Sequence, residues 1–86
     1  MNIRQTVVDV IAKNAKKPLP TGDEQALMGC AYLDEGIIDS LGIVMMVTEL
    51  EDSLGVSFSA EDMQSYEFQT IGGLIGRIDQ LLAAKA

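Results

Sequence analysis

The sequence predicts an all-α domain: a small four-helix bundle of three longer helices and one short helix, with a long loop between helices one and two. The apolar residues are almost all aliphatic, with two Phe, two Tyr and no Trp, and the alternating runs typical of strands are nearly absent. Apolar residues instead recur three or four positions apart, in stretches separated by proline or glycine. At 86 residues, the chain is expected to form one domain spanning residues 1–86.

The first helix is expected to run from Asn2 to about Ala15, because one face is apolar for three turns. Pro18 and Pro20 then stop it. Lys13, Lys16 and Lys17 lie at its C-terminal end, where the negative end of the helix dipole stabilises positive charge. The positions on this face are Ile3, Val7, Val10, Ile11 and Asn14, all apolar except Asn14.

The connection over residues 17–39 is long for a small domain, and such loops are usually functional or partly structured. The stretch from Thr21 to Met28 could hold one helical turn, capped by Thr21 or Asp23 and ended by Gly29. The apolar side chains of the connection are expected to hold the loop on the bundle: Leu19, Leu27, Met28, Leu33, Ile37 and Ile38.

The second long helix is predicted to begin at Ser40, which stands where an N-cap residue is expected, and to end at Gly55. At about 100° per residue, one stripe of this helix is apolar and should face the core. Met45, Glu49 and Asp52 fall on the opposite face and should be exposed. The stripe comprises Ile43, Val47, Leu50 and Leu54, with Met46 at its edge.

Ser59 and Asp62 resemble a capping box and predict a short helix to about Ser65. Tyr66 and Phe68 are expected to anchor the following segment to the core. The last helix should run from Thr70 to about Ala83, with an apolar stripe of Ile71, Leu74, Ile75, Ile78, Leu81 and Leu82.

Three glycines of this last helix, Gly72, Gly73 and Gly76, map to the face away from the apolar stripe. Each costs about 1 kcal/mol relative to alanine in a helix interior. We expect Gly73 to face solvent, and the pattern assigns no role to the other two.

Eleven of the thirteen acidic residues lie between Pro18 and Gly76, a segment without Lys or Arg, and the net charge is −7. Such a surface repels nucleic acid and anionic lipid and attracts basic proteins. No apolar run is long enough to span a membrane, and no signal peptide or internal disulfide is indicated. The sequence therefore predicts a cytoplasmic protein, and its ends favour a discrete chain over a fragment of a larger enzyme.

The absence of histidine excludes Ser–His and Cys–His nucleophile pairs and any His-ligated metal site. Asp34, Glu35 and Asp39 lack the ligand spacing of a calcium-binding loop. Cys30 is expected to be a small packing residue. No catalytic residue and no metal ligand are predicted, so the chain is not expected to be an enzyme.

Residues 36–42 read Gly-Ile-Ile-Asp-Ser-Leu-Gly, and the last four, Asp39, Ser40, Leu41 and Gly42, stand at a predicted helix start. This motif resembles that of the acyl carrier protein family. The flanks fit too: an amphipathic first helix, a long first loop, and Phe68-Gln69-Thr70-Ile71 before the last helix. The resemblance covers nearly the whole chain and is closer to D-alanyl and peptidyl-type carriers than to the main fatty-acid carrier.

The resemblance implies that Ser40 carries a phosphopantetheine arm, transferred from coenzyme A by a phosphopantetheinyl transferase. The arm's thiol would hold acyl or aminoacyl groups as thioesters for a loading ligase and downstream acyl-processing enzymes, in fatty-acid or secondary-metabolite biosynthesis. Asp39, Leu41 and Gly42 complete the expected attachment site. A helix N-terminus suits a phosphodiester anion, and Gly42 has no side chain to obstruct the arm.

Partner enzymes are expected to contact Met45, Glu49, Glu51 and Asp52 of the second long helix, and the carrier is expected to be a monomer. In the resembled family, acids on this helix meet basic patches on partners. The competing interpretation is an unmodified acidic helical adaptor that binds a basic protein. Modification of Ser40 separates the two.

Overall fold

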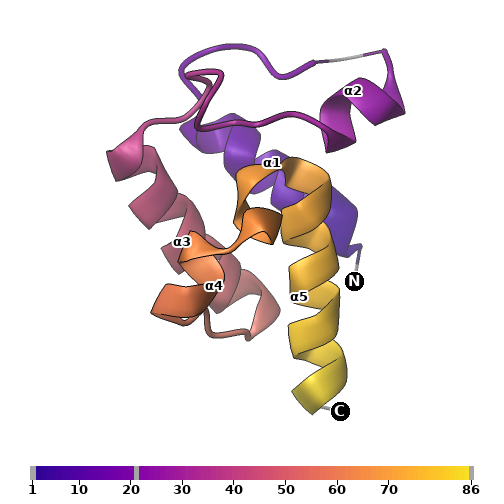
Figure 1. Cartoon of the computed structure of the whole chain (residues 1–86), viewed down its shortest axis with the longest axis vertical. Coiled ribbons are helices and arrows are strands. Elements are labelled where there is room, and N and C mark those ends of the chain that lie inside the picture. Colours follow the sequence, from indigo (N-terminus) through magenta and orange to yellow (C-terminus); the bar gives the residue numbers. More distant parts are fainter. Residues whose placement is uncertain (1, 21, 86) are drawn as a thin grey trace.

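Three long helices frame the structure, which is a computed structural model that describes residues 2–20 and 22–85 (Figure 1). No strand occurs among the described residues, so the predicted all-helical bundle is confirmed. Within those residues, no helix has the length and apolar character needed to cross a membrane. The elements are α1 (Ile3–Asn14), α2 (Glu24–Met28), α3 (Ser40–Leu54), α4 (Ala60–Gln64), the 3-10 helix η1 (Tyr66–Gln69) and α5 (Ile71–Lys85).

Local capping interactions set most helix ends. The Asn2 side chain caps α1, and Gly55 ends α3 in the left-handed conformation with φ 68°. The expected capping box of α4 is present: Ser59 Oγ accepts from the Asp62 N–H at 3.0 Å, and the Asp62 carboxylate accepts from the Ser59 N–H at 2.9 Å. These ends agree with the predicted ones because a cap depends on a few consecutive residues.

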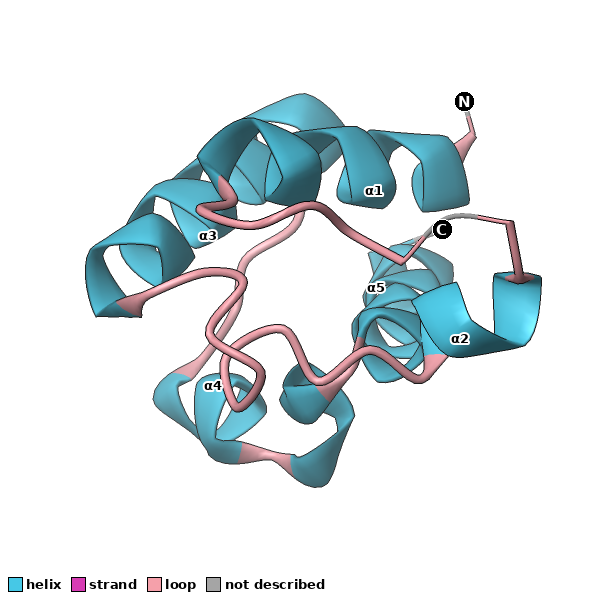
Figure 2. Ribbon diagram, turned by 90° about the horizontal axis from the view of Figure 1, so that it is seen from above, coloured by secondary structure: helices cyan, strands magenta, loops and turns pink. Residues whose placement is uncertain are grey.

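The long connection after α1 runs back beside α1 toward α2, and its second half returns toward the start of α3 (Figure 2). Asp23 caps α2 and Gly29 ends it, as predicted; Thr21, the other candidate cap, lies outside the described residues. Helix α1 packs against α3 and α5, while α2 packs against α5. The loop is thus held between helices at both ends.

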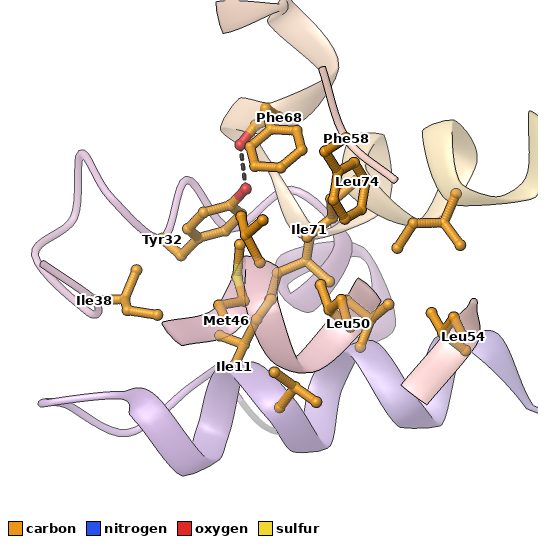
Figure 3. Close-up of a cluster of buried hydrophobic side chains, with 14 of the residues drawn as sticks. Ile11, Tyr32, Ile38, Met46, Leu50, Leu54, Phe58, Phe68, Ile71 and Leu74 are labelled. Carbon is orange, nitrogen blue, oxygen red and sulfur yellow. Dashed lines mark hydrogen bonds between the residues drawn. The ribbon is translucent and has the colours of Figure 1, made fainter. Parts of the chain in front are cut away.

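Tyr32 ties the second half of this loop to the far side of the molecule. Its ring is 1% exposed, and its hydroxyl donates a hydrogen bond to the Phe68 carbonyl oxygen (Figure 3). Nearby, the Cys30 carbonyl accepts from the Ile71 N–H at 3.2 Å. Leu33, expected to hold the loop, is 50% exposed, so that prediction was wrong. The other five loop residues are buried or partly buried as predicted.

The core side of α3 is rotated relative to the predicted stripe. Met46, expected at the edge, is fully buried, whereas Ile43 is only partly buried. Buried Tyr32 and Ile38 of the loop join the helices in the core (Figure 3), so α3 is covered by more than its helical neighbours. A stripe predicted from helical periodicity considers only packing between helices, so it cannot include the residues of α3 that the loop buries.

The segment after α4 is anchored by Phe68 and not by Tyr66. Phe68 is buried and packs edge-to-face on Phe58, with ring centroids 5.3 Å apart. Tyr66 is 82% exposed, which corrects the expectation that both rings reach the core. The 3-10 turn places these residues on different sides, because side chains two positions apart diverge in such a turn.

Two of the three glycines of α5 allow a close approach of neighbouring backbone. A Cβ on Gly73 would overlap the Glu67 carbonyl oxygen, and one on Gly72 would lie 3.0 Å from the Met28 carbonyl oxygen. A Cβ on Gly76 would meet only open space. The expectation that Gly73 simply faces solvent was therefore wrong, because η1 folds back onto the first turn of α5.

Candidate functional site

The N-terminus of α3 is capped by Asp39, and Ser40 is the first residue of the helix. The Asp39 carboxylate accepts a hydrogen bond from the Gly42 N–H at 2.8 Å. This corrects the prediction that Ser40 is the cap. Both residue types cap well, but the carboxylate also gains from the positive end of the helix dipole. The Ser40 side chain is therefore exposed and is not committed to capping.

Lys16 holds Asp39 from the side. Its Nζ lies 2.7 Å from Asp39 Oδ2, and its backbone N–H donates to the Ile37 carbonyl oxygen at 2.6 Å. The Lys16 ammonium, followed by the Gly42 N–H, lowers the pKa of Asp39 below its ordinary value. The end of α1 and the start of α3 are thus joined beside Ser40, a contact that the sequence analysis missed because the residues are far apart in the chain.

Gly42 has a packing role that differs from the expected one. It is buried, and a Cβ there would lie 2.6 Å from Ile38 Cγ1 and 3.2 Å from Asp39 Oδ1. The absent side chain therefore makes room for Ile38 and for the cap. This close packing is a role that the sequence did not indicate, and the expectation that Gly42 also leaves room for an arm on Ser40 stays a prediction.

The first turn of α3 can stabilise an anion. Backbone N–H groups at a helix N-terminus have no intrahelical acceptor, and those of Ser40 and Leu41 precede the one that Asp39 binds. Together with the dipole of a 15-residue helix, they favour negative charge next to the serine. The arrangement fits a phosphodiester on Ser40.

The four residues predicted to meet partners do not form one free acidic surface. Met45 is 49% exposed and Asp52 is exposed, as expected. Glu49 is half-buried between helices, where it pairs with Lys13 at 3.2 Å, so its predicted free exposure was wrong. Glu51 accepts from the Phe58 N–H at 2.9 Å. Both glutamates thus support the fold.

An exposed apolar strip follows Ser40 directly on α3. It consists of Leu41, Val44 and Met45, with 69%, 61% and 49% of each residue exposed. Residues three and four apart share a helix face, so the strip is continuous. Leu41 was predicted only as part of the attachment site, and Val44 was not predicted at all. Val44 could have been found in the sequence, because it is an apolar residue of this helix that lies outside the predicted core stripe.

Cys30 offers no reactive thiol. It is 2% exposed, and burial, with the nearby Glu35, raises the pKa of its thiol. Its predicted packing role is confirmed. Within residues 2–20 and 22–85, no group of three or more His, Cys, Asp or Glu side chains could hold a metal ion.

Comparison with known proteins agrees with this geometry. Residues 5–78 match the family described as a phosphopantetheine attachment site. D-alanyl carrier protein 1 of Lactiplantibacillus plantarum is 28% identical over 78 residues, which cover 91% of both chains. D-alanyl carrier protein 2 of the same organism is 25% identical over 80 residues, which cover 93% of this chain and 94% of the relative.

Proposed function

This chain belongs to the family of phosphopantetheine carrier proteins, and we propose that Ser40 is the residue that carries the arm. One observation carries the proposal: Ser40 is exposed in the first turn of α3, while Asp39 provides the cap. The serine can be modified without loss of the interaction that starts the helix. The arm, once attached, supplies a terminal thiol that holds an acyl or aminoacyl group as a thioester.

The residues around Ser40 support the bound phosphodiester in two ways. The N–H groups of the first turn and the helix dipole favour its negative charge. Lys16 balances the charge of Asp39, which would otherwise repel a phosphate on the next residue. Asp39 accepts from Gly42 and pairs with Lys16, so it is poorly placed to act as the base that activates Ser40. A phosphopantetheinyl transferase therefore supplies that base and takes the arm from coenzyme A.

Partner enzymes contact α3 through the apolar strip of Leu41, Val44 and Met45. An exposed apolar surface beside an attachment point suits transient docking, and the flexible thioether of Met45 adapts to different partners. Asp52, two turns further along, steers basic partners toward the strip. The partners in this proposal are a loading ligase and downstream acyl-processing enzymes, and the chain acts on its cargo only as a carrier.

An aminoacyl group is the cargo that the comparison favours, because both relatives are named as D-alanyl carriers. The proposal is tested by offering the holo chain a panel of aminoacyl and fatty acyl groups with the cognate ligase.

Intact mass spectrometry tests the attachment site. The chain is incubated with coenzyme A and a broad-specificity transferase, alongside Ser40→Ala and a control, Ser53→Ala, which removes an exposed hydroxyl of the same helix. The wild type and Ser53→Ala should gain the mass of one arm, and Ser40→Ala should gain none. An increment that persists in Ser40→Ala would contradict the assignment. A wild type that gains no mass would favour the unmodified adaptor.

A further inference from the structure

Lys16 lies just past the end of α1 and contacts the segment that leads into α3 at two points. Its backbone N–H donates to the Ile37 carbonyl oxygen at 2.6 Å, and its ammonium lies 2.7 Å from Asp39 Oδ2. Ile37 is 4% exposed, and its own N–H donates to the Tyr32 carbonyl oxygen at 2.9 Å. Lys16 is therefore anchored to fixed backbone before its side chain reaches Asp39.

The two oxygens of the Asp39 carboxylate have different partners. Oδ1 accepts from the Gly42 N–H at 2.8 Å, while Oδ2 faces the Lys16 ammonium. The last torsion of an aspartate side chain has broad, roughly two-fold minima, so one partner alone leaves the carboxylate free to turn. Contacts on both oxygens hold it in the orientation that caps α3.

The ion pair between Lys16 and Asp39 has a modest effect. Most exposed pairs contribute little, because two long side chains must be immobilised to form them. This cost is reduced here, since the aspartate is short and already binds Gly42. The two side chains are nevertheless 63% and 45% exposed, so solvent weakens their attraction. Such a pair can bias a choice between two local structures of similar free energy.

The start of α3 offers such a choice, because aspartate and serine cap helices about equally well. In the structure Asp39 is the cap, and its carbonyl oxygen accepts from the Ile43 N–H at 2.9 Å. With Ser40 as the cap, the serine oxygen would accept from the N–H of Gly42 or Ile43 and would turn toward the helix. The first arrangement leaves the hydroxyl exposed and free to react.

We propose that Lys16 is a positioning residue for arm transfer: by holding Asp39 as the cap, it keeps the Ser40 hydroxyl free for the transferase. The inference rests on the proposed function. In the transfer, the Ser40 oxygen forms a bond to the phosphorus that carries the pantetheine, and the diphosphate bridge of coenzyme A breaks. Adenosine bisphosphate leaves, and the hydroxyl proton passes to the base that the transferase supplies.

Steady-state kinetics of arm transfer, with the carrier concentration varied at saturating coenzyme A, test the proposal. Lys16→Gln should raise the KM for the carrier about two- to five-fold and leave kcat nearly unchanged. The transferase binds the population with a free hydroxyl, and a higher carrier concentration compensates for a smaller population. Lys16→Arg keeps the charge and should restore most of the wild-type KM.

Lys13→Gln is the matched control. It also removes one positive charge and one ion pair with α3, because Lys13 lies 3.2 Å from Glu49, but it leaves Asp39 untouched. Its KM should equal that of the wild type. An equal rise in Lys13→Gln would overturn the proposal, because the effect would then come from lost charge or from a weaker contact between the helices.

Asp39→Asn tests whether Lys16 acts through Asp39. The asparagine can still cap α3 with its one oxygen, but it has no second oxygen for Lys16. Adding Lys16→Gln to Asp39→Asn should therefore cause no further rise in KM. A rise as large as that in the wild-type background would overturn the proposal, because Lys16 would then contact the transferase directly.

Intact mass spectrometry of the same reactions separates this inference from the proposed function. A chain that gains the arm on Ser40 with the same KM in the wild type and in Lys16→Gln refutes this inference alone. A chain that gains no arm refutes the proposed function and this inference with it.

Discussion

Asp39 and Ser40 divide two tasks that the sequence pattern assigned to one residue. Asp39 caps α3 and is held by Lys16, while Ser40 is left exposed as the first helical residue. The pattern could locate the helix start because small polar residues before an apolar run are a local signal. It could not decide between two adjacent capping residues, because that choice depends on Lys16 from another helix.

Replacing the two residues separately should show the division. Ser40→Ala should change the free energy of unfolding by no more than about 0.5 kcal/mol, because no cap is lost. Asp39→Ala should lower the denaturant midpoint clearly, because the Gly42 N–H and Lys16 both lose their partner. Urea unfolding of the two variants measures this. A larger loss of stability in Ser40→Ala than in Asp39→Ala would show that Ser40, and not Asp39, is the N-cap of α3.

The individual helices were predictable wherever their ends depend on neighbouring residues. The capping box of α4 and the glycine end of α3 follow from short patterns. The outer faces were less predictable. Glu49 was assigned to solvent by its helical angle, yet Lys13 of α1 pairs with it. The same limit applied to Gly73, since its neighbour Glu67 belongs to a turn that the pattern did not predict.

The glycines of α5 should respond in opposite directions to the same substitution. Gly76→Ala should stabilise the chain by up to about 1 kcal/mol, because there is open space for the methyl group. Gly73→Ala should destabilise it, because the methyl group would overlap the Glu67 carbonyl oxygen and that backbone must move. Denaturant midpoints of the two variants provide the test. Stabilisation by Gly73→Ala would show that η1 does not lie against α5.

Two adjacent methionines of α3 allow a matched test of the contact surface. Met45→Glu should leave the unfolding midpoint nearly unchanged and slow loading by the cognate ligase, because Met45 is 49% exposed. Met46→Glu should destabilise the fold by several kcal/mol, since it places a charge at a site with no exposure. A normal loading rate for Met45→Glu would remove Met45 from the partner surface.

The charge of Asp52 should act on the rate of encounter. Asp52→Lys should slow loading at low salt and much less at high salt, because an exposed charge steers a partner over distances that salt screens. Loading rates measured across a salt series, with Met45→Glu as the comparison, distinguish steering from direct packing. A slowing that is equal at all salt concentrations would argue against steering.

Across the whole molecule, polar contacts join segments that are far apart in the chain, and the sequence did not predict these contacts. The Tyr32 hydroxyl reaches Phe68, and Arg77 of α5 lies 2.7 Å from Asp62, which is 7% exposed. Amphipathic patterns identified the core faces of the helices, since burial follows periodicity. They carry no information on which polar groups meet, so Tyr32 and the Asp62–Arg77 pair appeared only in the structure.

The Asp62–Arg77 contact predicts a pH dependence of stability. The Ser59 N–H, followed by Arg77, holds the pKa of Asp62 below its ordinary value. A carboxylate with a lowered folded-state pKa adds stability that is complete above its unfolded pKa of about 3.9 and is lost as pH falls through the folded value. Asp62→Asn should therefore be less stable than the wild type near neutral pH, and the difference should narrow in acid.

Thermal or urea unfolding of both chains across this pH range checks the prediction. Asp52→Asn is the control, since Asp52 is exposed and, within the described residues, its side chain makes no hydrogen bond or ion pair. The difference in stability between Asp52→Asn and the wild type should stay nearly constant across the pH range. A constant difference for Asp62→Asn as well would mean that its charge does not stabilise α4 against α5.

The central claim is that Ser40 carries the phosphopantetheine arm, and fragment-ion mass spectrometry of the modified chain tests it most directly. After reaction with coenzyme A and the transferase, every fragment that contains Ser40 should carry the added mass, and fragments that end at Asp39 or begin at Leu41 should not. An added mass on any other residue, or a chain that stays unmodified under conditions that modify a known carrier, would contradict the claim.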